Sequence, residues 1–264
     1  MLNSETYFSL DNEKEYFGST QFKRFLKCES EALAIVNGIY KPETTTALLV
    51  GSYVDAFFER RLDKFIADHP EIINKRNGGL KTDYIQANEI IERCKQDKLF
   101  MQFMGGEKQE IMTAKLFGVP FKIKIDSYHP GEMIVDLKVM KDFEPVYVPG
   151  KGKLSFVDAY GYDIQGAIYQ AVEQQAQIDK GNLDAPKLPF FLACATKQND
   201  GADIEIFQIP QYKLDAALAI VEHYIDEFAG VKRGEIYPRR CEKCAWCRKT
   251  KVLKAPKVLE DESE

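Results

Sequence analysis

Two runs of alternating apolar and polar residues, at 119–128 and 133–140, constrain the fold more than any other segment of this 264-residue chain. A period of two is typical of strands with one buried face. Pro130-Gly131 between the runs predicts a tight turn. If the hairpin closes symmetrically about Gly131, Asp126 faces Asp136, and facing side chains have Cβ atoms about 5 Å apart. The sequence therefore predicts two carboxylates side by side on one face of a sheet.

A third charged residue, Lys138, is expected on the same face, two residues after Asp136. Two adjacent carboxylates repel, and burying them is costly unless a proton or a cation bridges them. Mg²⁺ and Mn²⁺ prefer such oxygen ligands, and a nearby lysine can orient a water or offset charge on a phosphate. The alternative is a surface ion-pair ladder with no catalytic role. His129, in the turn, is a minor further candidate.

The remaining pattern predicts an α/β fold with one domain at residues 1–254 and a charged tail at 255–264. No repeat or low-complexity linker divides the chain. A central mixed β-sheet flanked by helices, in the core order αβββαβ, fits the sequence best. Strands are expected at 110–117, 119–128, 133–140, 188–197 and 202–209, and the first three are expected to form a three-stranded meander. Helices are expected at 18–38 with Ser19 or Thr20 as the cap, at 44–68, at 82–104 with Thr82 as the cap, at 158–180 and at 211–230.

Composition excludes several classes of protein. A hydrophobic content of 45% with 29% charged residues is unlike a disordered chain. No apolar run approaches the ~20 residues that span a bilayer, and the first residues lack a secretion signal, so we expect a cytoplasmic protein without membrane contact. The net charge of −5 hides a basic block between Val231 and Ala255, where nine Lys and Arg accompany two Glu. This block predicts contact with DNA phosphates, and the alternative is a solvated face balanced by the acidic tail.

Three of the six cysteines fall in one short motif, Cys241-x2-Cys244-x2-Cys247. In an intracellular protein this spacing indicates a metal or cluster site before disulfides. Cys94 and Cys194 lie in apolar segments and are expected to be buried core thiols.

The hairpin carries a resemblance to a known superfamily. Asp126, nine intervening residues and then Asp136-Leu137-Lys138 resemble the PD-(D/E)xK nuclease signature. The order of elements over residues 18–250 is similar to that of the RecE and YqaJ phage-type exonucleases and the RecB-family nuclease domains. The resemblance implies a restriction-endonuclease-like core and a metal-dependent DNA exonuclease of phage recombination or DNA processing. It also implies DNA, as a duplex end or single strand, and a single-strand annealing protein as partners.

Two helical motifs extend the resemblance. Gly51 and Asp55 are similar to the glycine and metal ligand that precede the hairpin in these families, with aspartate in place of the common histidine and Glu59 as a rival. The glycine is expected to permit close packing of the helix. Gln165 and Tyr169 resemble the Gln-xxx-Tyr motif that lines the active site. The implied metal ligands are Asp55, Asp126, Asp136 and the carbonyl of Leu137, and the implied catalytic residues are Asp126, Asp136, Lys138, Gln165 and Tyr169.

One early and three late cysteines resemble the iron–sulfur arrangement of AddB-type nucleases and CRISPR adaptation nucleases. The resemblance implies that Cys28, Cys241, Cys244 and Cys247 hold a [4Fe–4S] cluster that joins the two ends of the domain. The spacing differs from the C-x2-C-x5-C of several of those nucleases. Zinc bound by four cysteines and unligated reduced thiols are the alternatives. For the whole chain, a non-catalytic DNA-binding protein on the same fold and a zinc-binding interaction module are the alternative functions.

Overall fold

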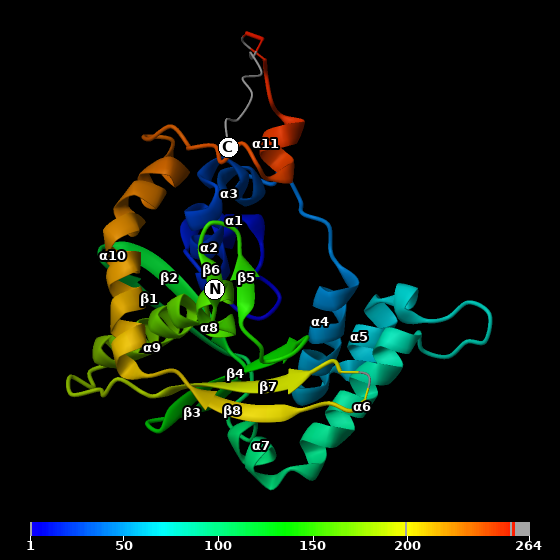
Figure 1. Cartoon of the computed structure of the whole chain (residues 1–264). Coiled ribbons are helices and arrows are strands. Elements are labelled where there is room, and N and C mark those ends of the chain that lie inside the picture. Colours follow the sequence, from blue (N-terminus) through cyan, green and yellow to red (C-terminus); the bar gives the residue numbers. More distant parts are fainter. Residues whose placement is uncertain (1, 199, 254, 257–264) are drawn as a thin grey trace.

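A four-stranded mixed sheet forms the centre of the computed structural model, which describes residues 2–198, 200–253, 255 and 256 (Figure 1). Its strand order is β3-β4-β7-β8. β4 pairs in parallel with β7, and the other two pairings are antiparallel. The strands are β3 (Ser127–His129), β4 (Met133–Met140), β7 (Phe190–Thr196) and β8 (Ile204–Gln208). The expected α/β fold with a mixed sheet is confirmed.

The predicted three-stranded meander is wrong, because its strands belong to two sheets. β1 (Glu110–Leu116) and β2 (Val119–Ile125) form a separate antiparallel pair. Asp126 follows β2 and lies outside both strands, so the chain changes sheet at this residue. The β3–β4 register pairs Ser127 with Val135, which confirms a turn centred on Gly131. A small hairpin of β5 (Val146–Val148) and β6 (Gly152–Leu154) was not predicted.

Four of the five predicted helices each divide in two. The 18–38 helix breaks at Cys28, whose backbone is extended, and the 44–68 helix breaks near Arg60, whose φ is +59°. The 82–104 helix breaks at Asp97, whose carboxylate accepts the N–H of Phe100 and starts a new helix. The 158–180 helix breaks at Gly161, in the left-handed region.

The short helical segments at 10–15, 70–72 and 245–249 were not predicted, and the other helices lie close to the predicted ranges. The N-cap of α2 is Gly18 in place of the expected Ser19 or Thr20, and the N-cap of α6 is Lys81 in place of the expected Thr82. In the described structure, neither residue makes a side-chain capping hydrogen bond. The helices are α1 (Leu10–Glu15), α2 (Ser19–Lys27), α3 (Glu29–Val36), α4 (Thr46–Phe58), α5 (Leu62–Asp68), the 3₁₀ turn η1 (Pro70–Ile72), α6 (Thr82–Gln96), α7 (Lys98–Phe103), α8 (Phe156–Tyr160), α9 (Tyr162–Asp179), α10 (Gln211–Arg233) and α11 (Ala245–Lys249).

Two hydrophobic cores lie on the two faces of the central sheet. One core joins the sheet to α2, α3, α9, α10 and the β1–β2 pair, and the other joins it to α4, α6 and α7 (Figure 1). β4 serves both cores by alternation: Ile134 packs in the first, and Val135 and Leu137 pack in the second. By the same alternation, Asp136 and Lys138 share the face of the first core.

The C-terminal helix α11 packs against α3, which lies near the start of the chain, at one side of the molecule (Figure 1). The predicted tail at 255–264 lies almost entirely outside the described residues. Among the described helices, none combines the length and apolar character needed to cross a membrane.

Candidate active site and cysteine cluster

The middle of β4 carries the first two candidate site residues. Asp136 is buried, with 2% of its surface exposed, and its Oδ2 forms an ion pair with the ammonium of Lys138. Apart from this contact, Oδ2 has no hydrogen-bond partner among the described residues. Burial opposes the charge of Lys138, but the carboxylates of Asp136 and Asp126 outweigh it and raise the pKa of the lysine above its usual value. Lys138 is therefore a fixed cation beside an incompletely satisfied carboxylate.

Asp126 lies beside this pair, as the predicted register requires. Its Oδ2 accepts a hydrogen bond from the backbone N–H of Leu137 at 3.0 Å, and its Oδ1 accepts one from Nε2 of Gln109 at 3.3 Å. Burial and the charge of Asp136 raise the pKa of Asp126 from 3.8 to about 6, although Lys138 opposes the shift. The two carboxylates thus form the repelling pair that the sequence predicted.

The upstream acid reaches the same place from α4, which packs against β4. Burial first, and then the charge of Asp126, raise the pKa of Asp55 well above its usual value. Glu59 is one turn further along and lines the same cavity, but its carboxylate is paired with Arg61. Asp55 is therefore the better upstream ligand candidate. The expected packing role of Gly51 is wrong, because an added Cβ there would meet no atom within 4 Å.

The glutamine and tyrosine of α9 act differently from each other. Gln165 is buried, and its Nε2 donates to Oδ1 of Asp136 at 2.7 Å. Tyr169 donates its hydroxyl to the backbone oxygen of Lys124 at 3.0 Å, and burial raises the pKa of its phenol well above the usual value. Gln165 therefore positions a carboxylate, whereas Tyr169 forms part of the wall.

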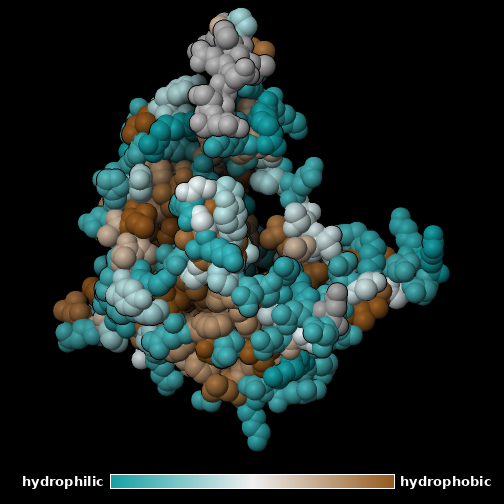
Figure 2. Space-filling view, viewed as in Figure 1, coloured by the Kyte–Doolittle hydropathy of each residue, from teal (hydrophilic) through white to brown (hydrophobic). Residues whose placement is uncertain are grey.

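A cavity of about 840 Å³ is lined by Asp55, Asp126, Asp136, Lys138 and Tyr169, whereas Gln165 contacts Asp136 without being part of the wall. Figure 2 shows a dark recess between the surface that covers α4 and the rest of the molecule. Its wall carries equal numbers of acids and cations, and three of the cations, Arg61, Lys122 and Lys138, form ion pairs with acids of the same wall. The cations are Arg24, Lys41, Arg61, Lys122, Lys124 and Lys138.

Sequence reasoning missed several neighbours of the site. The ring centroid of Tyr162 lies 5.1 Å from the Lys138 ammonium. Its position three residues before Gln165, on the same face of the helix, was a sequence signal that could have identified it. Lys124 precedes Asp126 by two residues and lines the same cavity. No sequence signal indicated Gln109, which lies before β1 with a φ of +55°. Lys23 of α2 lies in the field of Lys138, and burial followed by that charge lowers its pKa to about 8.

His129 has a structural role among the described contacts. Its Nε2 lies 2.9 Å from the backbone oxygen of Phe103 and 3.4 Å from Oγ of Ser127. It is absent from the cavity wall. Its candidacy as a site residue gains no support.

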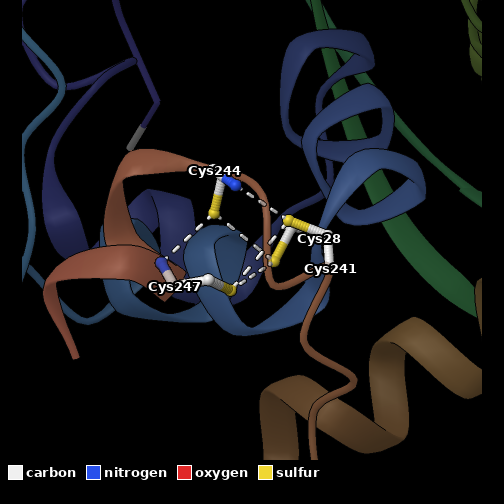
Figure 3. A group of neighbouring side chains, drawn as sticks. All are labelled: Cys28, Cys241, Cys244 and Cys247. Carbon is white, nitrogen blue, oxygen red and sulfur yellow. Dashed lines mark hydrogen bonds between the residues drawn. The ribbon is translucent and has the colours of Figure 1, made fainter. Parts of the chain in front are cut away.

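A second site gathers four thiols from both ends of the chain (Figure 3). Cys28 occupies the break between α2 and α3, and the other three surround the start of α11. Their sulfurs all lie within 4.8 Å of one another. Among the described residues, no other set of three or more cysteine, histidine or carboxylate ligands is this tight, so the carboxylates of the cavity are spaced more widely. Cys94 and Cys194 are buried in the two cores, as predicted.

The basic block is partly used within the molecule. Lys232 is bonded to backbone oxygens of Glu13 and Tyr16. Within the described chain, three arginines of the block form ion pairs. Arg233 pairs with Glu235, Arg239 pairs with Glu29 and Glu227, and Arg240 pairs with Glu242. Among the described residues, this leaves Lys243, Arg248, Lys249 and Lys251 for the predicted contact with phosphate, while Lys254 lies outside the described residues.

Comparisons with known proteins agree with this geometry. The sequence profile described as "PDDEXK-like domain of unknown function (DUF3799)" matches residues 18–250. The crystal structure of a protein named "Putative exonuclease" from Eubacterium rectale aligns at a TM-score of 0.90 and 45% identity, over 98% of this chain and 96% of that chain. The structure of SSO0001 aligns over 86% of this chain and 91% of that chain at 12% identity, and its TM-score of 0.27 is too low to support any argument. No curated protein matches the chain. Because the profile spans most of the chain and the two acids and the lysine of the signature meet in space, this protein belongs to the PDDEXK-like family DUF3799 of the PD-(D/E)xK nuclease superfamily.

Proposed function

We propose that this chain is a metal-dependent deoxyribonuclease that digests DNA from an end. The observation that carries the proposal is the meeting of Asp126, Asp136 and Lys138 beside Asp55 on the wall of one cavity. The name of the Eubacterium rectale relative supports exonuclease activity. We assign the activity to a domain at residues 1–254.

The acids fit a hard divalent cation. Burial and mutual repulsion raise the pKa values of Asp55 and Asp126, and Oδ2 of Asp136 has only the Lys138 ammonium beside it. A cation relieves that repulsion, so Asp55, Asp126, Asp136 and the carbonyl of Leu137 would hold Mg²⁺ or Mn²⁺. When bound, such an ion lowers the pKa of a water and offsets negative charge on a phosphate.

The chain's own residues supply orientation and charge. Gln165 fixes the rotamer of Asp136 through its 2.7 Å hydrogen bond. Lys138 keeps its proton, so it acts as a cation that orients a water and stabilises a phosphate oxygen. Tyr169 and Lys124 shape the wall on which a DNA strand would lie. Salt-sensitive binding follows, because cations of the wall would displace counterions from DNA.

The experiment compares end-labelled linear DNA with closed circular DNA, each with Mg²⁺, with Mn²⁺ or with a chelator. We expect metal-dependent release of nucleotides from linear DNA, no cleavage of the circle, and no activity in Asp136→Asn. Cleavage of the circle would contradict digestion from an end but not nuclease activity. DNA binding without cleavage by the wild-type protein in any metal would identify a non-catalytic binding protein, and the absence of both would leave a zinc-binding interaction module.

The same preparation tests the predicted biological context. The resemblance to phage-type exonucleases supports a role in recombination or DNA processing together with a single-strand annealing protein. Coupled digestion and annealing with such a protein is the expected result, and independence of the two reactions would contradict the partnership.

A further inference from the structure

The cysteine cluster has the dimensions of a site for one metal ion. The measured sulfur–sulfur distances are 3.5 Å between Cys28 and Cys247, 3.9 Å between Cys28 and Cys244, and 4.0 Å between Cys241 and Cys247 (Figure 3). Zinc binds thiolate at about 2.3 Å, so a regular tetrahedron around one ion separates its sulfurs by about 3.8 Å. The measured distances lie on both sides of this value.

A four-iron cluster does not fit the same arrangement. Each thiolate of a [4Fe–4S] cluster binds a different iron, so the cube of iron and sulfide lies between the four ligands. The sulfurs must then stand further apart than around a single ion. With all four sulfurs within 4.8 Å of one another, the cluster leaves room for an ion but not for a cube.

The backbone around the motif also suits a tetrahedral thiolate site. The N–H of Cys244 donates to Sγ of Cys241 at 3.2 Å, and the N–H of Cys247 donates to Sγ of Cys244 at 3.3 Å. These bonds orient successive sulfurs and disperse the negative charge of thiolates. The guanidinium of Arg240 donates to the backbone oxygen of Cys247 at 2.7 Å, which adds a positive charge beside the group.

The fourth ligand comes from a place where the chain had to break a helix. Cys28 is extended between α2 and α3, with 4% of its surface exposed. Around it, the N–H of Ser30 donates to the backbone oxygen of Arg239, and Nε1 of Trp246 donates to Oγ of Ser30. These hydrogen bonds join the segment around Cys28 to the C-terminal segment, and the four sulfurs converge where the two segments meet.

We propose that Cys28, Cys241, Cys244 and Cys247 hold one structural zinc ion in place of the iron–sulfur cluster that the resemblance implies. Four protein ligands leave no open position, so the ion takes no part in the reaction. It fixes the end of α2, whose Arg24 lines the catalytic cavity, against the C-terminal segment. Zinc binding is then part of the folding free energy.

The test begins with the wild-type protein, purified anaerobically from cells supplied with both iron and zinc. Elemental analysis, acid-labile sulfide and the visible spectrum are measured on one preparation. We expect one zinc per chain, negligible iron and sulfide, and a colourless solution. After release of zinc by a mercurial reagent, loading with Co²⁺ is expected to give the absorption bands of tetrahedral cobalt thiolate. Iron with sulfide in near-stoichiometric amounts, or a chain without either metal, would overturn the proposal.

Two serine variants then test the ligand set. Cys28→Ser is expected to lose most of the bound zinc and to melt at a lower temperature. Cys94→Ser is the control, because Cys94 is equally buried but lies in α6, outside the cluster. Full zinc content in Cys28→Ser would remove this residue from the site and contradict a four-cysteine ion. Because metal content needs no DNA cleavage, this result is independent of the proposed nuclease activity.

Discussion

Replacing Asp126 by Asn is expected to stabilise the metal-free protein above pH 6. Asp126 has a pKa of about 6 in the folded protein, because burial and the charge of Asp136 disfavour its ionised form. The unfolded chain has the ordinary value of 3.8. The folded state therefore binds a proton more tightly, and the stability that this proton contributes is lost as the pH rises through about 4 to 6.

The magnitude follows from the pKa difference. A rise from 3.8 to about 6 corresponds to about 3 kcal/mol of unfolding free energy, since each pH unit is worth ~1.4 kcal/mol. Asparagine avoids this cost and can keep both hydrogen bonds. Its Oδ1 can accept from Leu137, and its amide can donate to Oε1 of Gln109, a buried oxygen without a partner in the described structure. That second bond requires only a flip of the glutamine amide.

Urea denaturation in a chelator, from pH 4 to 8, measures the difference between wild type and Asp126→Asn. We expect the two free energies of unfolding to agree near pH 4 and to diverge in favour of the variant by pH 7. Saturating Mg²⁺ should reverse the order, because an ion that binds the folded state stabilises the wild type more. Parallel curves across the whole pH range in the chelator would refute the raised pKa assigned to Asp126.

Three further predictions concern the site and its support. Asp136→Asn should abolish metal-dependent cleavage while circular dichroism stays unchanged, since asparagine can still accept the hydrogen bond of Gln165; an active variant would remove Asp136 from the metal site. Lys138→Ala should lower turnover by about 10²–10⁴-fold and leave metal affinity by calorimetry largely intact, whereas loss of affinity with normal turnover at saturating metal would contradict the role of the lysine. Gly106→Ala should destabilise the protein by about 1–3 kcal/mol, because the added Cβ would clash with the carbonyl oxygen of Tyr128. Gly51→Ala, at a position on α4 with open space around it, should stabilise the protein by up to ~1 kcal/mol. Equal urea midpoints for the two variants would disprove both assignments.

The local pattern of the sequence predicted the part of the site that one hairpin carries. Alternation about Gly131 was enough to place Asp126 beside Asp136, because register in a hairpin follows from its turn. Spacing of four on a helix likewise placed Gln165 and Tyr169 on one face of α9. These relations depend only on geometry within one or two elements.

The rest depends on contacts between distant segments. The division of the meander into two sheets could not be predicted, because alternation continues through Asp126 while the backbone leaves the strand there. The break at Cys28 occurs inside a run with helical character, and the contacts at the junction are made by residues some 200 positions later. Lys122 also lies on the charged face of β2 in the sequence pattern, yet its side chain is buried and paired with Glu13 of the N-terminal segment. Pairing partners of this kind carry no local signal.

The break at Cys28 has a consequence for the order of synthesis. Cys28 and Cys247 are 219 positions apart, so at about 5–20 residues per second a ribosome makes them roughly 10–40 seconds apart. The residues of the carboxylate site, up to Tyr169, are all made before the C-terminal cysteines. During that interval the end of α2 has no partner from the C-terminal segment. A nascent chain, or one shortened before Cys241, therefore contains every acid of the site but lacks the cysteine cluster that joins the N-terminal and C-terminal segments.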